Sequence, residues 1–237
     1  MLLKTEAITR FLKHSTHQDL ADMYTYNMEV QVNVAKENGE RITREYKGKE
    51  FQAWTDGIAT WKSFRIPHNA YTKPEYTDTE MSYDITKYAE GIGMTGWDWK
   101  NQKSLWVAFD FDAIVGHSEK HQQKLTDQEL KELRDSLSSV EWVTVRYSTS
   151  GSGLHLYVHL DEPVSTATHT EHAALARSIL CKMSAETGID LQAKVDACGQ
   201  VMWVWHRKMV GTNGLKVIKK GVPLKQVPLN WREHLDV

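Results

Sequence analysis

Cysteine is scarce in this sequence, and long apolar runs are missing. The 237 residues include two cysteines, Cys181 and Cys198, too few for a disulfide scaffold and without the paired spacing of a structural zinc site. The N-terminal segment MLLKTEAITRFLKHSTHQDLADMY is interrupted by charge throughout. It therefore has neither the apolar core of a signal peptide nor the ~20 apolar residues that span a bilayer. We expect a protein of a reducing cytoplasm that is neither exported nor bound to a membrane.

A large net charge is missing as well. Because the formal net charge is -2 at pH 7, no overall positive charge attracts nucleic acid, and a polyanion site would have to be local. From residue 199 onward, basic residues outnumber acidic ones: Arg207, Lys208, Lys216, Lys219, Lys220, Lys225 and Arg232 against Glu233 and Asp236. By charge alone, this excess fits a solvated face as well as a binding surface. The composition is that of an ordinary globular protein, without an internal repeat or low-complexity tract. The length of the chain allows one large domain or two small domains that share a cleft.

One apolar stretch ends in an unusual way. The segment SLWVAFDFDAIVG, residues 104–116, is apolar enough for a buried strand, yet it contains Asp110 and Asp112. Side chains alternate along a strand, so the two carboxylates share one face about 7 Å apart, while Phe109 and Phe111 point the other way. Two ionised groups that close repel each other unless a cation lies between them. The pattern therefore indicates a site for a divalent metal ion.

The chain after this strand has a regular order of elements. TDQELKELRDSLSS predicts a helix with a capping box at Thr126 and Glu129, and HTEHAALARSILCKMSAETG predicts a second helix that ends at Gly188. WVTVRY and GLHLYVHL predict strands joined by the turn STSGSG, and VMWVWHRK predicts a last strand. The resulting order β-α-β-β-α-β is typical of a ferredoxin-like or RRM-type unit, with both helices on one face of an antiparallel sheet and the other face open.

The first 100 residues are predicted to be mixed α/β. Short helices are expected within residues 7–24, and MEVQVNVAKENGERITREY predicts a hairpin around Asn38-Gly39. EFQAWTDGIATWKSFRIP predicts further short strands, and HNAYTKPEYTDTEMSYD predicts a loop.

The predicted topology brings polar residues together. In the βαββαβ order the first and third strands are neighbours, which places Asp110, Asp112 and His155 in one small area. Carboxylate ligands suit Mg²⁺ or Mn²⁺, which bridge phosphate oxygens, so the pattern indicates phosphoryl or nucleotidyl transfer. A third carboxylate is wanted, and both Asp190 and Asp196 precede the last strand.

Other polar and aromatic residues have plainer interpretations. Two histidine pairs have ligand spacing on a helix, His117 with His121 and His169 with His172. No glutamate completes a zinc-protease pattern, so we expect these pairs to face solvent. Trp203 and Trp205 are either core residues or base-stacking platforms, and we expect the core.

Four segments, taken in order, resemble a known family. EGIGMTGWDW, LWVAFDFD, STSGSGLHLYV and KVDACGQVMWVWHRKMVGTNGLK are similar to the signature blocks of the archaeo-eukaryotic primase superfamily, in particular the primase-polymerases of phages, plasmids and mobile elements. The resemblance covers roughly residues 61–216. It implies an RRM-like catalytic unit joined to a smaller α/β unit, with the active site in the cleft between them. The expected boundaries are residues 1–100 for the N-terminal unit and 101–237 for the catalytic unit.

The family's three motifs fall on particular residues. Its hDhD motif falls on Asp110 and Asp112 and its later hD motif on Asp196, which implies that these three hold metal, with Asp190 as a rival for the third position. Its sxH motif falls on His155, implied to contact nucleotide phosphates, although Gly153 stands where the pattern has serine.

Further nucleotide contacts are implied with less motif support. Ser150 and Gly153 belong to the turn that would cradle phosphate through backbone N–H groups. Lys62 and Arg65 in ATWKSFRIP, and Arg207 downstream of Asp196, would contact triphosphate or template.

The resemblance implies a DNA primase-polymerase. Such an enzyme carries out template-directed nucleotidyl transfer on single-stranded DNA, making or extending a primer from dNTPs or NTPs with two Mg²⁺ or Mn²⁺ ions. We expect the protein to be a monomer that binds template and primer in the cytoplasm of a bacterial or phage-infected cell. A helicase domain or protein is expected as a further partner. Template binding should weaken with salt.

Two alternatives remain. VAFDFDAIVG also resembles the DxDGT segment of haloacid dehalogenase-type phosphatases, but those have a parallel sheet and a late acidic pair, whereas this C-terminal third is basic. The other alternative is a catalytically inactive RRM-like module that binds single-stranded nucleic acid. Intact carboxylates count against it, because without metal they repel phosphate.

Overall fold

The computed structural model describes the backbone of residues 2–3, 28–35, 41–46, 49–54, 61–65, 80–81, 89–99, 101–112, 114–115, 123–206, 214 and 216–235. Side chains are described in residues 93–99, 101–112, 125–204, 214 and 216–235. The helices expected within residues 7–24, most of the loop expected after residue 67, His117, His121 and Arg207 lie outside the described residues.

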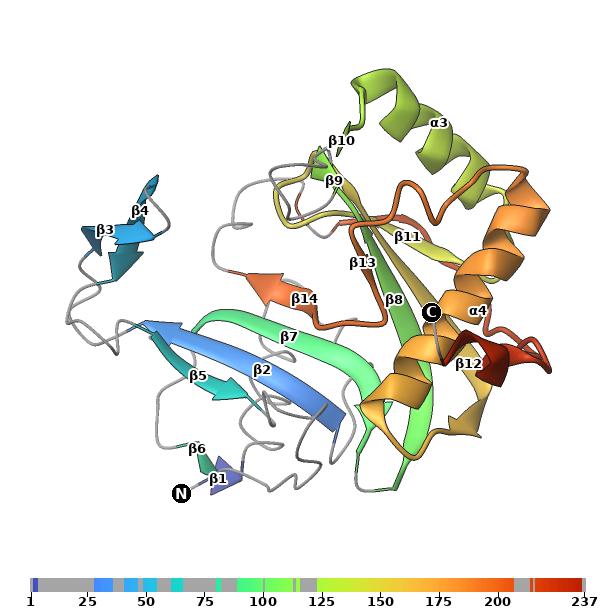
Figure 1. Ribbon diagram of the computed structural model, residues 1–237, viewed down its shortest axis with the longest axis horizontal. Helices are drawn as coiled ribbons and strands as arrows, with labels where there is room; N and C mark the ends of the chain where they lie inside the picture. The colour runs from blue at the N-terminus through green and yellow to red at the C-terminus, as the bar shows by residue number, and fades with distance from the viewer. Residues whose placement is uncertain are drawn as a thin grey trace.

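A nine-stranded sheet is the main feature of the fold (Figure 1). Its strands are β2 (Met28–Ala35), β5 (Trp61–Arg65), β7 (Ala89–Asp98), β8 (Lys103–Phe111), β11 (Thr144–Tyr147), β12 (Leu154–Ser165), β13 (Ala197–Cys198), β14 (Met202–His206) and β15 (Val217–Lys219). The hydrogen-bonded order is β15-β11-β12-β8-β7-β2-β5, with β13 paired to β8 and β14 paired to β7. All these pairings are antiparallel. β7 and β8 lie on either side of residue 100, the expected boundary between the two units, and pair with each other in this sheet. The division into units 1–100 and 101–237 stays a prediction.

Three two-stranded pairs lie outside this sheet among the described residues. They are β1 (Leu2–Leu3) with β6 (Glu80–Met81), β3 (Arg41–Tyr46) with β4 (Lys49–Trp54), and β9 (Ile114–Val115) with β10 (Gln123–Lys124).

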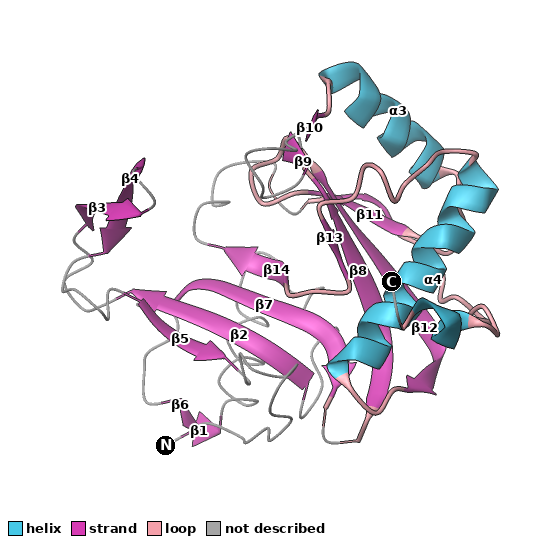
Figure 2. Cartoon of the chain, in the orientation of Figure 1, coloured by secondary structure: helices cyan, strands magenta, loops and turns pink. Residues whose placement is uncertain are grey.

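Two helices cover one side of β8, β11 and β12 (Figure 2). They are α3 (Asp127–Ser138) and α4 (His169–Thr187), and a short 3-10 helix, η4 (Trp231–His234), follows near the C-terminus. The core between helices and sheet is apolar because each element presents its hydrophobic stripe to it. Its contributors include Phe109 and Phe111 of β8, Leu133 and Leu137 of α3, and Ile179 and Met183 of α4. No helix within the described ranges combines the length and apolarity needed to cross a bilayer.

The helix ends follow the local sequence signals. The Thr126 side chain accepts a hydrogen bond from the Glu129 backbone N–H, and the Glu129 carboxylate accepts one from the Thr126 backbone, which completes the predicted capping box. Helix α4 ends at Gly188, whose φ of 70° lies in the left-handed region that glycine adopts without strain. The predicted β-α-β-β-α-β order is confirmed from β8 to the strands after α4, and β8 lies beside β12 as expected.

One expectation about strand pairing is wrong. The hairpin expected around Asn38-Gly39 does not form, because β2 pairs with β5 and β7 whereas β3 pairs with β4. The predicted last strand forms β14, which pairs with β7, while the short β13 before it pairs with β8. A turn signal favours a reversal of the chain, but β2 and β3 each pair with other strands because strand pairing depends on long-range packing.

The second face of the sheet is not open. Tyr157 of β12 is 1% exposed and Trp106 of β8 is 2% exposed, although both point away from the helices. The Tyr157 hydroxyl lies 3.5 Å from the Trp203 carbonyl oxygen and donates a hydrogen bond to it, so β14 passes over this face. The polar residues of β12 therefore lie in a covered site.

The two histidines at the start of α4 are also buried, contrary to the expectation that they face solvent. His169 is 4% exposed and His172 is fully buried. His172 Nδ1 lies 2.7 Å from the Ser104 hydroxyl, which places this ring against β8. Their spacing puts both residues on one helix face, and that face is the one that packs on the sheet.

Candidate active site

Three carboxylates converge at the end of β8. One oxygen of each of Asp110, Asp112 and Asp196 lies within 4.8 Å of the others, and all three residues are half-buried. We call this group the carboxylate cluster. Asp110 and Asp112 share a face because they are two residues apart at the end of an extended strand.

A short stretch of backbone brings Asp196 to this position. The Asp196 N–H donates to the Asp110 carbonyl at 2.8 Å, and Ala197 is paired with Asp110 where β13 meets β8. Gly199 N–H donates to the Ala108 carbonyl at 2.9 Å, which continues the contact along β8. Asp190, the rival for the third position, is not part of this cluster: it is exposed, and its Oδ1 accepts from the Ala193 N–H at 3.3 Å.

His155 lies directly across from Asp110. The two residues are register partners on β12 and β8, and His155 Nε2 is 3.4 Å from Asp110 Oδ1. That separation exceeds the roughly 2.7–2.9 Å of a charge-assisted hydrogen bond. Within the described part of the chain, neither Asp110 Oδ1 nor His155 Nδ1 has a hydrogen-bond partner, although both atoms are buried. Because buried polar atoms are costly to leave unpaired, the site is suited to receive a ligand.

The turn between β11 and β12 presents hydroxyl groups. We call residues 148–153 the hydroxyl turn. The Ser148 hydroxyl accepts from the Gly153 N–H at 2.9 Å, and the Ser148 N–H donates to the Gly153 carbonyl at 2.8 Å. Ser150 Oγ contacts Ser148 Oγ at 3.2 Å and Ser152 Oγ at 2.7 Å. Thr149 Oγ1 is buried without a hydrogen-bond partner among the described residues.

Gly153 lies too close to β8 to carry a side chain. A Cβ atom there would approach the Phe111 carbonyl oxygen to 2.5 Å and Asp112 Oδ1 to 2.7 Å. Serine at this position would push the hydroxyl turn away from Asp112. This contact gives a physical reason for the glycine that departs from the family pattern.

These groups surround one pocket of about 600 Å³. Its lining residues are Asp110, Asp112, Ser148, Thr149, Ser150, His155, Asp196, Ala197, Gln200, Val201, Met202 and Trp203. The pocket therefore brings together the sequence-predicted carboxylates, the histidine and Ser150. Trp203, for which the core was expected, is half-buried and lines the pocket, whereas the side chain of Trp205 lies outside the described residues.

Sequence reasoning missed a cationic neighbour of this pocket, Arg146. It is the register partner of His155 on β11, is 6% exposed, and its guanidinium carbon lies 5.7 Å from the Tyr157 ring centroid. Burial lowers the pKa of His159 on the same face, and the charges of Arg146 and Lys220 lower it further. The available signal was that Arg146 falls on the same alternating positions of its strand as Ser148.

Three predicted basic residues are not placed at the pocket. Lys62 and Arg65 belong to β5, which β7 and β2 separate from β8, a distance of about 14 Å at ordinary strand spacing. Their side chains, like the whole of Arg207, lie outside the described residues.

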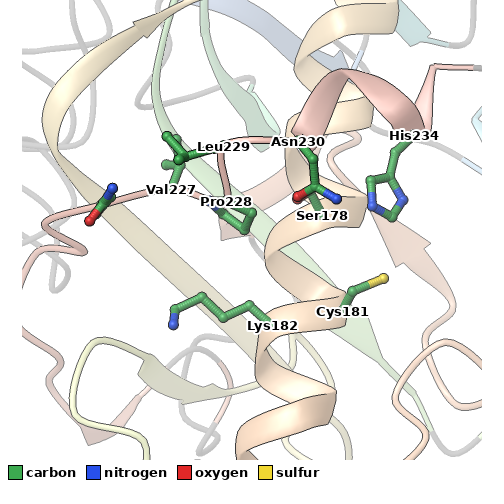
Figure 3. A pocket seen from close by; sticks show the side chains of 9 residues that line it. Ser178, Cys181, Lys182, Val227, Pro228, Leu229, Asn230 and His234 are labelled. Carbon is green, nitrogen blue, oxygen red and sulfur yellow. The ribbon is translucent and has the colours of Figure 1, made fainter.

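A second hollow of about 570 Å³ lies on the outer side of α4 (Figure 3). Ser178, Cys181 and Lys182 of α4 face the chain segment that contains Pro228 and Asn230. The Cys181 sulfur accepts from the Gln192 amide at 2.8 Å. Its described lining residues include no carboxylate and none of the sequence-predicted site residues.

No protein-family model matches the chain, and no curated protein matches its sequence. Among solved structures, it is similar to the AEP domain of the cyanophage S-2L primase-polymerase, at 10% identity and a TM-score of 0.38, covering 92% of this chain and 95% of that one. It is also similar to the polymerase domain of Mycobacterium tuberculosis ligase D in complex with DNA, at 15% identity and a TM-score of 0.37, covering 98% of this chain and 82% of that one. Both TM-scores are below 0.5, so the function of this chain is inferred from its own site.

Proposed function

We propose that this chain is a metal-dependent nucleotidyltransferase of the primase-polymerase type, which copies a single-stranded DNA template. The observation that carries the proposal is the carboxylate cluster, three acids with oxygens within 4.8 Å of one another. It shares a pocket with His155 and the hydroxyl turn. A site for a polyphosphate needs both a means of holding cations and donors for phosphate oxygens, and this pocket offers both.

The donor set fits Mg²⁺ or Mn²⁺. All three side chains offer carboxylate oxygen, the ligand type that hard divalent cations prefer, and the buried Asp110 Oδ1 lacks a hydrogen-bond partner among the described residues. Asp110, Asp112 and Asp196 would hold the metal, which when bound polarises phosphate oxygens and neutralises their charge. A soft or thiolate-preferring metal is not favoured, because no cysteine lines the described pocket.

The remaining pocket groups would bind and orient the nucleotide. His155 and the hydroxyls of Thr149 and Ser150 would donate hydrogen bonds to phosphate oxygens. Lys62, Arg65 and Arg207 are proposed as further contacts to triphosphate or template, on the strength of the motif resemblance alone. The active site would then lie between the units 1–100 and 101–237 of a cytoplasmic replication enzyme.

The phosphatase alternative does not fit this fold. Haloacid dehalogenase-type enzymes have the nucleophilic aspartate on a parallel sheet, whereas β8 is antiparallel to β7, β12 and β13. The inactive binding module is disfavoured for a different reason, since a carboxylate cluster without a cation repels nucleic-acid phosphates.

Primer extension tests the proposal. A labelled primer on single-stranded DNA is incubated with Mg²⁺ or Mn²⁺ and with dNTPs or NTPs, beside an unprimed template. We expect templated products, and Asp110→Ala or Asp112→Ala should lower synthesis by at least about 100-fold while leaving thermal unfolding and template binding largely unchanged.

Asp190→Ala is the matched control, because it removes a carboxylate that lies outside the cluster. It should retain synthesis. Full activity in Asp110→Ala would remove that residue from the site, and a wild-type protein inactive with every metal and nucleotide would refute the proposal. Products on the unprimed template would identify de novo priming.

A further inference from the structure

Val201 and Trp203, which we call the aromatic wall, line the same pocket as the acidic and hydroxyl groups. In β14, Met202 is 2% exposed and Val204 is fully buried, whereas Trp203 is half-buried, as is Val201 directly before the strand. Val201 and Trp203 are two residues apart in extended backbone and therefore project to one side; both line the pocket, as does part of Met202 between them.

The aromatic wall packs against the backbone of β7 at Gly93. Trp203 is the register partner of Gly93. A Cβ atom at Gly93 would lie 2.4 Å from Val201 Cγ1 and 3.4 Å from Trp203 Cε3. The indole therefore packs on bare backbone, and any larger residue at position 93 would displace Val201 first.

The two sides of the pocket differ in chemistry. The carboxylate cluster, His155 and the hydroxyl turn are polar, whereas Val201, Met202 and Trp203 contribute apolar and aromatic groups, with the polar Gln200 before them in the chain. A volume of about 600 Å³ lies within the roughly 300–1,000 Å³ usual for small-molecule sites. A ligand that fills both sides has an anionic, metal-binding end and a flat apolar end. Inorganic polyphosphate would leave the aromatic wall unused.

We propose that Trp203 forms the base subsite of the pocket, where its indole stacks on the base of a nucleoside triphosphate whose phosphates meet the carboxylate cluster. This inference rests on the proposed function and assigns a residue to recognition of the nucleoside. Every base has a π-face, so such stacking tolerates any sequence. That tolerance is what a template-directed enzyme requires, because the template strand supplies the choice of base.

Calorimetric titration of two ligands tests the assignment. The full chain is titrated with dATP and, separately, with inorganic tripolyphosphate, both with Mn²⁺. Trp203→Ala should weaken dATP binding by about 5- to 150-fold, the range measured for loss of base–aromatic stacking. Binding of tripolyphosphate should change by less than about twofold, because it reaches only the polar side of the pocket.

Trp142→Ala is the matched control. Trp142 is also half-buried, but it lies on the helix side of the sheet, where its indole N–H donates to Glu186 Oε2. Its loss should leave both ligands at wild-type affinity.

Trp203→Phe provides a second readout that does not depend on deleting the ring. Phenylalanine keeps an aromatic face, so dATP binding should remain within about threefold of wild type. Adding dATP should quench tryptophan fluorescence more in the wild type than in Trp203→Phe, and tripolyphosphate should quench neither. Equal quenching by dATP in the two proteins would overturn the assignment.

The outcomes separate this inference from the function on which it rests. If the wild type binds tripolyphosphate and dATP equally well, or if Trp203→Ala binds dATP like the wild type, the base subsite is refuted and the metal and phosphate site stands. If the wild type binds neither ligand with Mn²⁺, the proposed function is refuted and the base subsite with it.

Discussion

Gly153 and Asp112 lie against each other where the hydroxyl turn meets the end of β8. The turn is held by hydrogen bonds between Ser148 and Gly153, and its closeness to β8 is what allows hydroxyls and carboxylates to share one pocket. The absence of a side chain at position 153 is therefore a condition for the site. Adding a single methyl group at position 153 tests whether the position of the hydroxyl turn determines the position of Asp112 at the end of β8.

Gly153→Ala should damage the site more than the fold. The new Cβ would meet the Phe111 carbonyl oxygen at 2.5 Å, and a backbone atom in a paired strand cannot give way easily. We expect a loss of about 1–3 kcal/mol in the free energy of unfolding, from urea denaturation. Mn²⁺ affinity, measured by electron paramagnetic resonance, should fall by about 10- to 100-fold because Asp112 is displaced.

Ser152→Ala is the control for this prediction. Ser152 is exposed in the same turn, and its hydroxyl contacts Ser150 rather than β8. It should keep wild-type stability and Mn²⁺ affinity. Wild-type Mn²⁺ affinity in Gly153→Ala would show that the turn and Asp112 do not constrain each other.

Helix α4 begins over a buried polar cluster. The Ser104 hydroxyl contacts His172 Nδ1 at 2.7 Å and Thr166 Oγ1 at 2.9 Å, and the His169 ring packs edge-on against Trp97. Burial lowers the pKa of His169 to about 4 and that of His172 to about 3, with the neighbouring His169 adding to the effect on His172. Both rings are therefore neutral in the folded protein at physiological pH.

This cluster should make the folded protein lose stability as the pH falls below the ordinary histidine pKa of about 6.5. In the unfolded chain both histidines take up protons near pH 6.5. In the folded chain, His169 is not protonated until about pH 4 and His172 not until about pH 3. The unfolded state binds more protons in that window, so stability falls as pH falls below 6.5. We expect a loss of about 1–2 kcal/mol per histidine between pH 6.5 and 5, from urea denaturation at a series of pH values.

His169→Phe should reduce this pH slope while keeping an aromatic ring beside Trp97. One titrating group is removed, so the remaining slope belongs mainly to His172 and, on the opposite face, to His159, whose pKa burial also lowers. A free energy of unfolding that stays constant between pH 7 and 5 would mean that the buried histidines do not control acid stability.

The whole sheet branches at β8, and this branching makes the pocket. One edge of β8 pairs with β12 along most of its length, while the other edge pairs with β7 at Ser104 and with β13 at Asp110. After β13 the chain leaves β8 and joins β7 as β14. The pocket lies where the two strands diverge, so the carboxylate cluster lies at the end of β8 and the start of β13, and the aromatic wall lies at the start of β14.

Cation binding should therefore stabilise the entire molecule. Three carboxylates this close repel one another, and a ligand that binds only the folded state adds about 2.7 kcal/mol at 100 times its Kd. For a chain of this size we expect Mn²⁺ to raise the Tm by about 5–10 °C over EDTA, measured by differential scanning calorimetry.

Asp112→Asn should abolish this gain. In EDTA it should melt at or above the wild-type temperature, because one repelling charge is gone. Asp190→Asn keeps the cluster intact and should gain like the wild type. An equal rise with Mn²⁺ in Asp112→Asn would place the cation elsewhere.

Local sequence was sufficient for features that depend on neighbours in the chain. The capping box at Thr126, the end of α4 at Gly188 and the shared face of Asp110 and Asp112 follow from backbone geometry over a few residues. The pairing of β8 with β12 followed from the order of elements, so His155 could be placed in the same small area as Asp110 and Asp112, whereas the register that sets it directly across from Asp110 came from the folded chain.

Features that depend on long-range packing needed the folded chain. Periodicity showed that His169 and His172 share a helix face, but only packing showed that this face lies against β8. The position of Trp203 beside the carboxylate cluster depends on β14 leaving β8 for β7, which no local pattern encodes. Strand pairing is chosen by the burial of distant surfaces, so the site's acids could be read from the sequence, whereas the shape of its pocket could not.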